Sequence, residues 1–310
     1  MDAETTDLMR ASIRELLETH DGDIATKLEE FGFTEVLDED PAMAIDLLFH
    51  EQGAAGKASS ALDTVACAGQ PSTASRRHVI HPFAAPAAST RRGTELQIDG
   101  VILSKSDGPA IVILEGGAVE IPAAEVNSGT SPVAGFDPAA ALRRVHLTLA
   151  ADTLTPIEGD WTDATSTLHR ALASELVGNG HAMLTIAAEQ ITERTQFGRP
   201  IGANQSPRHR LAETYALLGG AAELVHAAWR SGTPWDARVA KTYAGYAAEA
   251  TSRACLQVCG AIGLTTEHRL PIYAKRGRLL DALYGGWQQS IDALGGQLLA
   301  DAAVPDAVRI

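Results

Sequence analysis

The first seventy residues follow a helical pattern of apolar and polar positions. Apolar residues recur at helical spacing in Leu8, Ile13, Leu16 and Leu17, and again in Leu28, Phe31 and Phe33. A short polar turn is predicted at residues 38–40, and Pro41 is predicted to begin a second helical run that reaches Glu51. This part of the chain is therefore predicted to be helical.

Between residues 77 and 150 the pattern changes to short segments rich in β-branched residues. These segments are 95–98, 110–114 and 145–149. Turn signals of hairpins accompany them at Asp99-Gly100, Asp107-Gly108 and Glu115-Gly116-Gly117. The pattern predicts a small antiparallel β unit.

From Asp163 the helical period returns and continues to the end of the chain. One helical face is traced by Leu172, Leu176, Gly180, Met183, Leu184, Ala187 and Ile191. Three more helical stretches are predicted near 206–230, 235–260 and 269–300. We therefore predict a mainly α fold with a small β unit, divided into a helical domain over 1–80, a β domain over 81–155 and a helical bundle over 156–310.

Composition narrows the function. The chain has 25 basic and 39 acidic residues and a formal net charge of -14, which argues against nucleic-acid or anionic-membrane partners. No apolar stretch is long enough to span a membrane, the first thirty residues do not resemble a signal peptide, and three cysteines form no disulfide framework. A cytoplasmic location is expected. Cys255 and Cys259 are interpreted as buried thiols, and no metal site is predicted.

Two motifs in the last third of the chain indicate chemistry. The first is Arg194-Thr195-Gln196-Phe197-Gly198-Arg199-Pro200-Ile201, with Gln205 and Leu211-Ala212-Glu213 beyond it. A guanidinium at the end of a helix is suited to bind a pyrophosphate through two parallel hydrogen bonds. Taken alone, Arg194 is better explained as a solvated side chain beside Glu193, and the spacing of the surrounding residues is what favours the binding role.

The second motif is Lys241, followed sixteen residues later by Gln257-Val258-Cys259-Gly260-Ala261. A helix that ends in glycine lets backbone amides approach a ligand closely, because no Cβ intervenes. As a bare pattern this is weak evidence, since many helices end in glycine.

Together these motifs resemble the part of an acyl-CoA dehydrogenase that reaches across a subunit interface to the FAD of its neighbour. The resemblance implies a helical N-terminal domain, a middle β domain and a C-terminal four-helix bundle. It also implies that Arg194 contacts the FAD pyrophosphate and that Gln205 lies near the adenosine. The cofactor-binding residues that it implies are Arg194, Thr195, Gln196, Phe197, Gln205, Gln257, Gly260 and Ala261, where Gly260-Ala261 replaces the usual Gly-Gly of the family.

The resemblance fails at the catalytic base. Most members of the family carry a glutamate in a turn that corresponds to residues 283–287, and here no glutamate follows Glu267. A minority place the base on an earlier helix, at a position that is Leu168 here. Asp281 and His169 are the nearest substitutes and both are poor candidates, so no catalytic residue is assigned.

The β unit also departs from the family, because it is about half the expected length and lacks the stretches that hold the flavin ring. The resemblance therefore implies a short, non-catalytic subunit of an oxidoreductase, inactive alone. A full-length acyl-CoA dehydrogenase subunit would be its partner in an α2β2 heterotetramer, with FAD shared at the interface. The implied substrate is a bulky acyl-CoA of the kind formed in actinobacterial steroid catabolism.

Two alternatives remain open at this point. In the first alternative, the chain is a self-sufficient flavoenzyme that uses Asp281 or His169 as its base. In the second, it is a flavin-free paralogue with a structural role. An unrelated helical fold is a more remote alternative. Purified alone, a self-sufficient flavoenzyme would be yellow.

Overall fold

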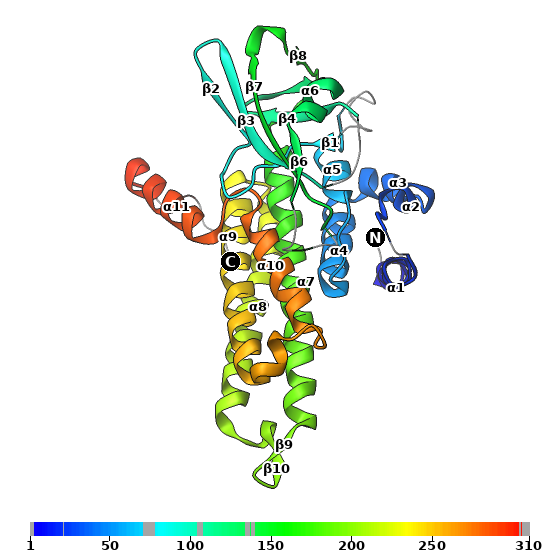
Figure 1. Cartoon of the computed structure of the whole chain (residues 1–310), viewed down its shortest axis with the longest axis vertical. Coiled ribbons are helices and arrows are strands. Elements are labelled where there is room, and N and C mark those ends of the chain that lie inside the picture. Colours follow the sequence, from blue (N-terminus) through cyan, green and yellow to red (C-terminus); the bar gives the residue numbers. More distant parts are fainter. Residues whose placement is uncertain are drawn as a thin grey trace.

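A computed structural model describes residues 3–20, 22–70, 78–103, 108–133, 137, 140–303 and 305. Figure 1 shows a long bundle of helices with the β unit at one end and the N-terminal helices along one side. The order of elements is helices, then strands, then the bundle. The predicted fold class, mainly α with a small β unit and a C-terminal four-helix bundle, is confirmed.

The N-terminal helices are α1 (Ala3–Thr19), α2 (Ala25–Glu30), α3 (Phe33–Glu39), α4 (Pro41–Ala55) and α5 (Ala61–Ala66). The predicted start at Pro41 is confirmed, because Asp40 caps α4 by accepting a hydrogen bond of 3.1 Å from the backbone N–H of Met43. The predicted polar turn is shorter than expected, since residues 38 and 39 still belong to α3.

The β unit contains two four-stranded sheets. One has the order β1 (His78–Val79), β4 (Ala110–Leu114), β5 (Gly117–Ile121) and β8 (Thr155–Pro156). The other has the order β2 (Ser89–Arg92), β3 (Glu95–Ile102), β7 (Arg143–Ala150) and β6 (Thr130–Pro132), and α6 (Ala123–Ser128) lies between β5 and β6 in the chain. The prediction of a wholly antiparallel unit is wrong at one pair, because β1 pairs with β4 in parallel.

The three predicted turns have different outcomes. Glu115-Gly116-Gly117 is confirmed as the hairpin between β4 and β5, where Leu114 pairs with Gly117. Asp99-Gly100 is wrong as a turn, because both residues lie inside β3 and pair with β7. Gly100 serves close packing instead, since a Cβ there would lie 2.5 Å from the carbonyl oxygen of His81. Asp107 lies outside the described residues.

The bundle comprises α7 (Ala164–Glu193), α8 (Gln205–Ser231), α9 (Pro234–Cys259) and α10 (Leu270–Ala282), and α11 (Trp287–Asp301) follows it. Figure 1 shows α11 leaving the side of the bundle. The prediction of one helix over 269–300 is wrong, because the chain turns between α10 and α11. Tyr284 and Gly285 there have φ angles of 59° and 84°, which a right-handed helix does not allow.

Glycine sets the distance between α4 and the bundle. A Cβ on Gly53 would lie 2.1 Å from the carbonyl oxygen of Glu175, and one on Gly178 would lie 2.0 Å from that of His50. The two helices therefore cross with their backbones in contact, and any side chain at either position would force them apart. This contact fixes the N-terminal helices against α7.

Candidate functional site

The first motif lies at the end of the bundle that is farthest from the sheets (Figure 1). Helix α7 ends at Glu193, and Arg194 turns the chain into an extended conformation with φ -71° and ψ 116°. A short hairpin follows, formed by β9 (Thr195–Gln196) and β10 (Arg199–Pro200). The backbone N–H of Ile201 donates to the carbonyl oxygen of Arg194 at 2.9 Å, which closes the loop back onto the end of α7.

Phe197 and Gly198 form the tip of this hairpin. Both residues have positive φ angles, 53° and 79°, as a two-residue hairpin turn between twisted strands requires. Phe197 is 100% exposed, so its ring packs against nothing in this chain. An aromatic ring held at the tip of a tight hairpin is well placed to contact another molecule.

The two motifs meet at Arg194. One guanidinium nitrogen, Nη1, donates a hydrogen bond of 3.2 Å to the carbonyl oxygen of Cys259 at the end of α9. Gly260 then takes φ 71° and ψ -151°, a conformation that strongly favours glycine, and a Cβ there would face Arg194 Nη1 at 3.8 Å. The guanidinium of Arg194 and the backbone of Gly260, which carries no side chain, therefore lie next to each other.

The remaining predicted residues surround this point on exposed positions. Gln205 is the first residue of α8, Gln257 lies in the last turn of α9, and Ala261 lies in the short 3-10 helix η4 (Gly260–Leu264). Thr195 and Gln196 are exposed on β9. A side-chain hydrogen bond from Arg194 to the carbonyl oxygen of Cys259 joins the two motifs.

This arrangement fits a pyrophosphate that approaches from outside the chain. The contact with Cys259 leaves the Nε and Nη2 groups of Arg194 able to donate to an anion, and among the described residues neither has a hydrogen-bond partner. Gly260 lets the anion approach the backbone without a steric clash. Arg194, Gln205 and Gln257 are all exposed, so an anion at this point would be open to solvent or to a second molecule on its other side.

Residues 283–287, which correspond to the catalytic turn of acyl-CoA dehydrogenases in the sequence resemblance, are held in place by buried contacts. Lys241, which is 1% exposed, extends from α9 and donates to the carbonyl oxygens of Asp281, at 2.6 Å, and Gly285. Burial lowers the pKa of Lys241 to about 8, and Asp281 opposes that shift. The turn is therefore held by a buried cation.

Asp281 has a structural role. Its Oδ1 atom accepts a hydrogen bond of 3.0 Å from the backbone N–H of Trp287, the first residue of α11. Burial raises the pKa of Asp281, although Lys241 and the Trp287 contact oppose the shift. A carboxylate that fixes the start of a helix in this way is not free to reach a substrate.

His169 is no better as a base. It is 9% exposed, and its ring lies edge-on to that of Tyr284 with 5.6 Å between the ring centroids. Burial, followed by the charges of Lys241, Arg238 and Arg170, lowers the pKa of His169 to about 3. An imidazole with so low a pKa is a weak proton acceptor at neutral pH. At the other family position, Leu168 is fully buried.

The burial of His169 is expected to lower the stability of the folded chain in acid. Between pH 6.5 and about 3 the unfolded chain protonates this histidine while the folded chain does not, so stability falls as the pH is lowered. As the pH falls through this window, we expect the free energy of unfolding of His169→Asn to decrease less steeply than that of the wild type, by up to about 1.4 kcal/mol per pH unit. The measurement is chemical denaturation from pH 7 to pH 4.5. His146→Asn, at a 78% exposed side chain, is the control, and parallel curves for wild type and His169→Asn would contradict the assignment.

The sequence motifs do not predict two groups of buried polar contacts near this turn, one made by Lys241 and one made by His81. In the sequence motif Lys241 only marks a spacing. Its helical spacing from Ala237 and Ala244 places it on an apolar face, and this indicates that its side chain is buried and needs polar partners. The second group is a chain of hydrogen bonds in which His81 contacts Asp63 at 2.7 Å and the Tyr284 hydroxyl at 3.0 Å. Nothing in the local sequence pattern indicates this second group.

Cys255 and Cys259 are buried thiols, and burial raises the pKa of Cys255 to about 12. Among the described residues, no group of three or more side chains lies close enough together to bind a metal. A search of the same residues finds no helix with the length and apolar character that a membrane span needs.

Comparison with known proteins gives a family match over part of the chain. Residues 161–290 match the model of the acyl-CoA dehydrogenase C-terminal domain. Over 145 residues the chain is 33% identical to the acyl-CoA dehydrogenase IpdE2 of Mycobacterium tuberculosis, an alignment that covers 47% of this chain and 44% of that protein. The chain thus spans less than half the length of this curated relative.

Two solved structures share the fold over nearly the whole chain. One is a steroid acyl-CoA dehydrogenase, the Tcur3481-Tcur3483 G363A variant, with a TM-score of 0.73, 20% identity, and coverage of 97% of this chain and 99% of that chain. The other is the ChsE4-ChsE5 complex of Mycobacterium tuberculosis, with a TM-score of 0.73, 19% identity, and coverage of 98% and 99%. At this level of identity the similarity establishes the fold.

Proposed function

We propose that this chain, whose residues 161–290 match the acyl-CoA dehydrogenase C-terminal domain, is the non-catalytic subunit of a heteromeric FAD-dependent acyl-CoA dehydrogenase. In this role it binds a full-length acyl-CoA dehydrogenase subunit and completes the FAD site of that partner. The partner supplies the catalytic base and the contacts to the flavin ring. Alone, the chain is inactive.

The observation that supports this proposal most strongly is the contrast between the two ends of the bundle. At the hairpin end, Arg194 and Gly260 form an exposed half of an anion site. At the other end, the turn that would hold the base contains Gly285 and is fixed by Lys241. The chain thus retains the groups that act on a neighbouring cofactor and lacks those that act on its own.

The role of each proposed residue follows from its position. Arg194 donates to the pyrophosphate of the partner's FAD, and the backbone at Gly260 and Ala261 lies against the same group. Phe197 inserts its exposed ring into the interface, with Thr195 and Gln196 beside it. Gln205 and Gln257 donate or accept hydrogen bonds along the adenosine part. FAD itself, when bound, supplies the acceptor for the hydride that leaves the acyl group.

The assembly we propose is an α2β2 heterotetramer, in which each FAD lies between unlike subunits. Structural support comes from the ChsE4-ChsE5 complex, which has the same fold. The proposed substrate is a bulky acyl-CoA derived from a steroid, because the other solved neighbour is a steroid acyl-CoA dehydrogenase. A tetramer with half of its sites removed has more room for a large polycyclic acyl group.

Two alternatives predict different behaviour. A self-sufficient flavoenzyme needs a base in this chain, and the described contacts of Asp281 and the low pKa of His169 argue against both candidates. A flavin-free structural paralogue would bind the partner without altering its flavin content.

Paired purification distinguishes these possibilities. The chain is purified alone and after co-expression with a full-length acyl-CoA dehydrogenase from the same organism, and flavin absorbance and solution mass are recorded for both. We expect a colourless or insoluble lone chain and a yellow tetramer with about two FADs, since each site needs one subunit of each kind. A yellow lone chain would contradict the proposal, and a complex whose flavin content matches that of the partner alone would favour the structural paralogue.

A further inference from the structure

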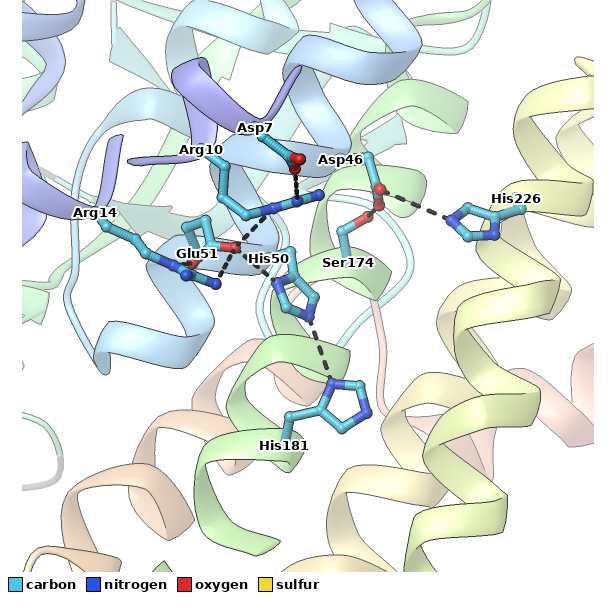
Figure 2. A network of polar contacts seen from close by, with 9 residues as sticks. All are labelled: Asp7, Arg10, Arg14, Asp46, His50, Glu51, Ser174, His181 and His226. Atoms are coloured by element: carbon cyan, nitrogen blue, oxygen red, sulfur yellow. Dashed lines mark hydrogen bonds and ion pairs between the residues drawn. The ribbon is translucent and has the colours of Figure 1, made fainter. Parts of the chain in front are cut away.

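A cavity of about 620 Å³ lies between the N-terminal helices and the bundle, lined by α1, α4, α7 and α8. Figure 2 shows the side chains that surround it: Asp7, Arg10, Arg14, Asp46, His50, Glu51, Ser174, His181 and His226. His181 precedes Arg194 by thirteen residues on α7, which corresponds to about 20 Å along the helix. This cavity is therefore separate from the proposed FAD contact.

Two histidines from different helices face each other in the cavity. The Nε2 atom of His50 on α4 lies 3.4 Å from the Nδ1 atom of His181 on α7. This is longer than the usual range of about 2.7–3.2 Å for a hydrogen bond donated by N–H. Two nitrogens bound to one zinc ion at about 2.0–2.1 Å in tetrahedral geometry would lie about 3.3–3.4 Å apart. The spacing fits a shared metal ion better than a direct hydrogen bond.

Glu51 orients the first of these rings. Its carboxylate is 2% exposed, accepts two hydrogen bonds from Arg14 at 2.5 and 3.2 Å, and has its Oε1 atom 3.4 Å from Nδ1 of His50. A carboxylate oxygen that faces Nδ1 favours the tautomer with its proton on that atom, and in this tautomer the lone pair of Nε2 faces His181. Metal-binding histidines commonly have a carboxylate in this position.

The rest of the cavity suits a cation. Three carboxylates, on Asp7, Asp46 and Glu51, outnumber the two arginines, so the fixed charge of the lining is negative. Asp46 lies one helical turn before His50 on α4, where it accepts a hydrogen bond of 2.6 Å from Ser174 and can accept others from metal-bound water. The cavity has room for the water that would complete the coordination.

We propose that His50 and His181 bind one divalent transition-metal ion, which links α4 to α7. Imidazole ligands favour zinc, nickel or copper over magnesium and calcium. The ion has two protein ligands, and water occupies its other positions, because the described residues include no group of three ligands. Such an ion would connect the N-terminal helices to the bundle beside the Gly53 and Gly178 contact.

The test is metal titration of the untagged full chain, alone or in its complex, after removal of metals with a chelator. With zinc as the probe, calorimetry should detect one ion per chain, and zinc should raise the unfolding temperature by preferential binding to the folded state. His181→Asn should weaken zinc binding at least tenfold. His226→Asn, at the other side of the cavity, is the matched control and should change it less than twofold.

Three outcomes would overturn the proposal. The first is no zinc binding at about 100 µM, far above the range of a useful site. The second is equal zinc affinity in wild type and His181→Asn. The third is a loss of zinc affinity in His226→Asn as large as that in His181→Asn, which would place the ion between Asp46 and His226. If His50→Asn proves unstable because Glu51 loses its contact, His181→Asn still decides the question, since the structure gives His181 no contact with that carboxylate. The test uses no flavin, so its result is independent of the proposed enzymatic role.

Discussion

Replacing Arg194 with alanine is expected to weaken FAD binding to the heteromeric complex tenfold to a hundredfold. The reason is the loss of a charge-assisted contact to the pyrophosphate, worth about 1.5–3 kcal/mol. The fold should survive, because Arg194 is exposed and the one hydrogen bond of its side chain to the described residues goes to the carbonyl oxygen of Cys259. The measurement is the FAD dissociation constant of the purified complex, obtained by titrating flavin into apoprotein and following its fluorescence.

Arg199→Ala is the matched control. Arg199 lies on the same hairpin and is also exposed, but its guanidinium donates to the side chain of Asn204 at 2.6 Å. We expect its loss to change FAD affinity less than threefold, because the Arg199 guanidinium is engaged by Asn204 and the charge of an exposed side chain is screened by water and salt. Equal effects of the two substitutions would indicate general electrostatic attraction. An unchanged affinity in Arg194→Ala would remove the pyrophosphate assignment while leaving heteromer formation to be judged from the mass of the complex.

Much of the fold follows from the sequence because apolar periodicity is a local signal. The helices of the bundle and most strands of the β unit bury one face each, so their apolar residues recur at the period of the element. The break between α10 and α11 could not be found in this way. It depends on Lys241, forty residues earlier in the chain, whose ammonium group binds the carbonyl oxygens of the turn.

The misassigned turn at Asp99-Gly100 has a similar cause. Glycine after aspartate is typical of a hairpin, but glycine is also required where a second backbone passes within contact distance. Only the position of His81, which is distant in sequence, distinguishes the two cases. Long-range contacts of this kind leave no periodic pattern.

In the candidate sites, too, local motifs could be predicted from the sequence and long-range contacts could not. Short motifs with fixed spacing predict the residues that we propose contact FAD, and the structure places those motifs at one end of the bundle, joined by Arg194 and Cys259. Their roles stay predictions, since they depend on a molecule outside this chain. His50 and His181 carry no motif, because they come from helices more than one hundred residues apart, as the 131-residue separation shows.

A buried ion pair between α7 and α10 should give the largest stability effect in the chain. Arg276, 5% exposed, donates from Nε and Nη2 to Oε1 of Glu175 at 3.1 and 2.5 Å, and Glu175 is 2% exposed. Arg276→Met removes the cation and leaves a carboxylate buried without its partner. We expect a loss of about 3–5 kcal/mol in the free energy of unfolding, the usual cost of breaking a buried pair.

A double substitution separates the loss of the pair from the loss of packing. Arg276→Met combined with Glu175→Met removes the two charges of this pair, so the variant should recover part of the stability, because an apolar pair of similar volume needs no desolvation. The recovery should be incomplete, because Asp137 also loses its 3.8 Å ion pair with Arg276. Arg278→Met is the surface control: Arg278 is 52% exposed and lies 3.3 Å from Glu249, so its loss should cost less than about 1 kcal/mol. Chemical denaturation of the four proteins provides the values. If Arg276→Met were no less stable than Arg278→Met, the bridge would not hold α10 against α7, and the turn that Lys241 closes would need another support.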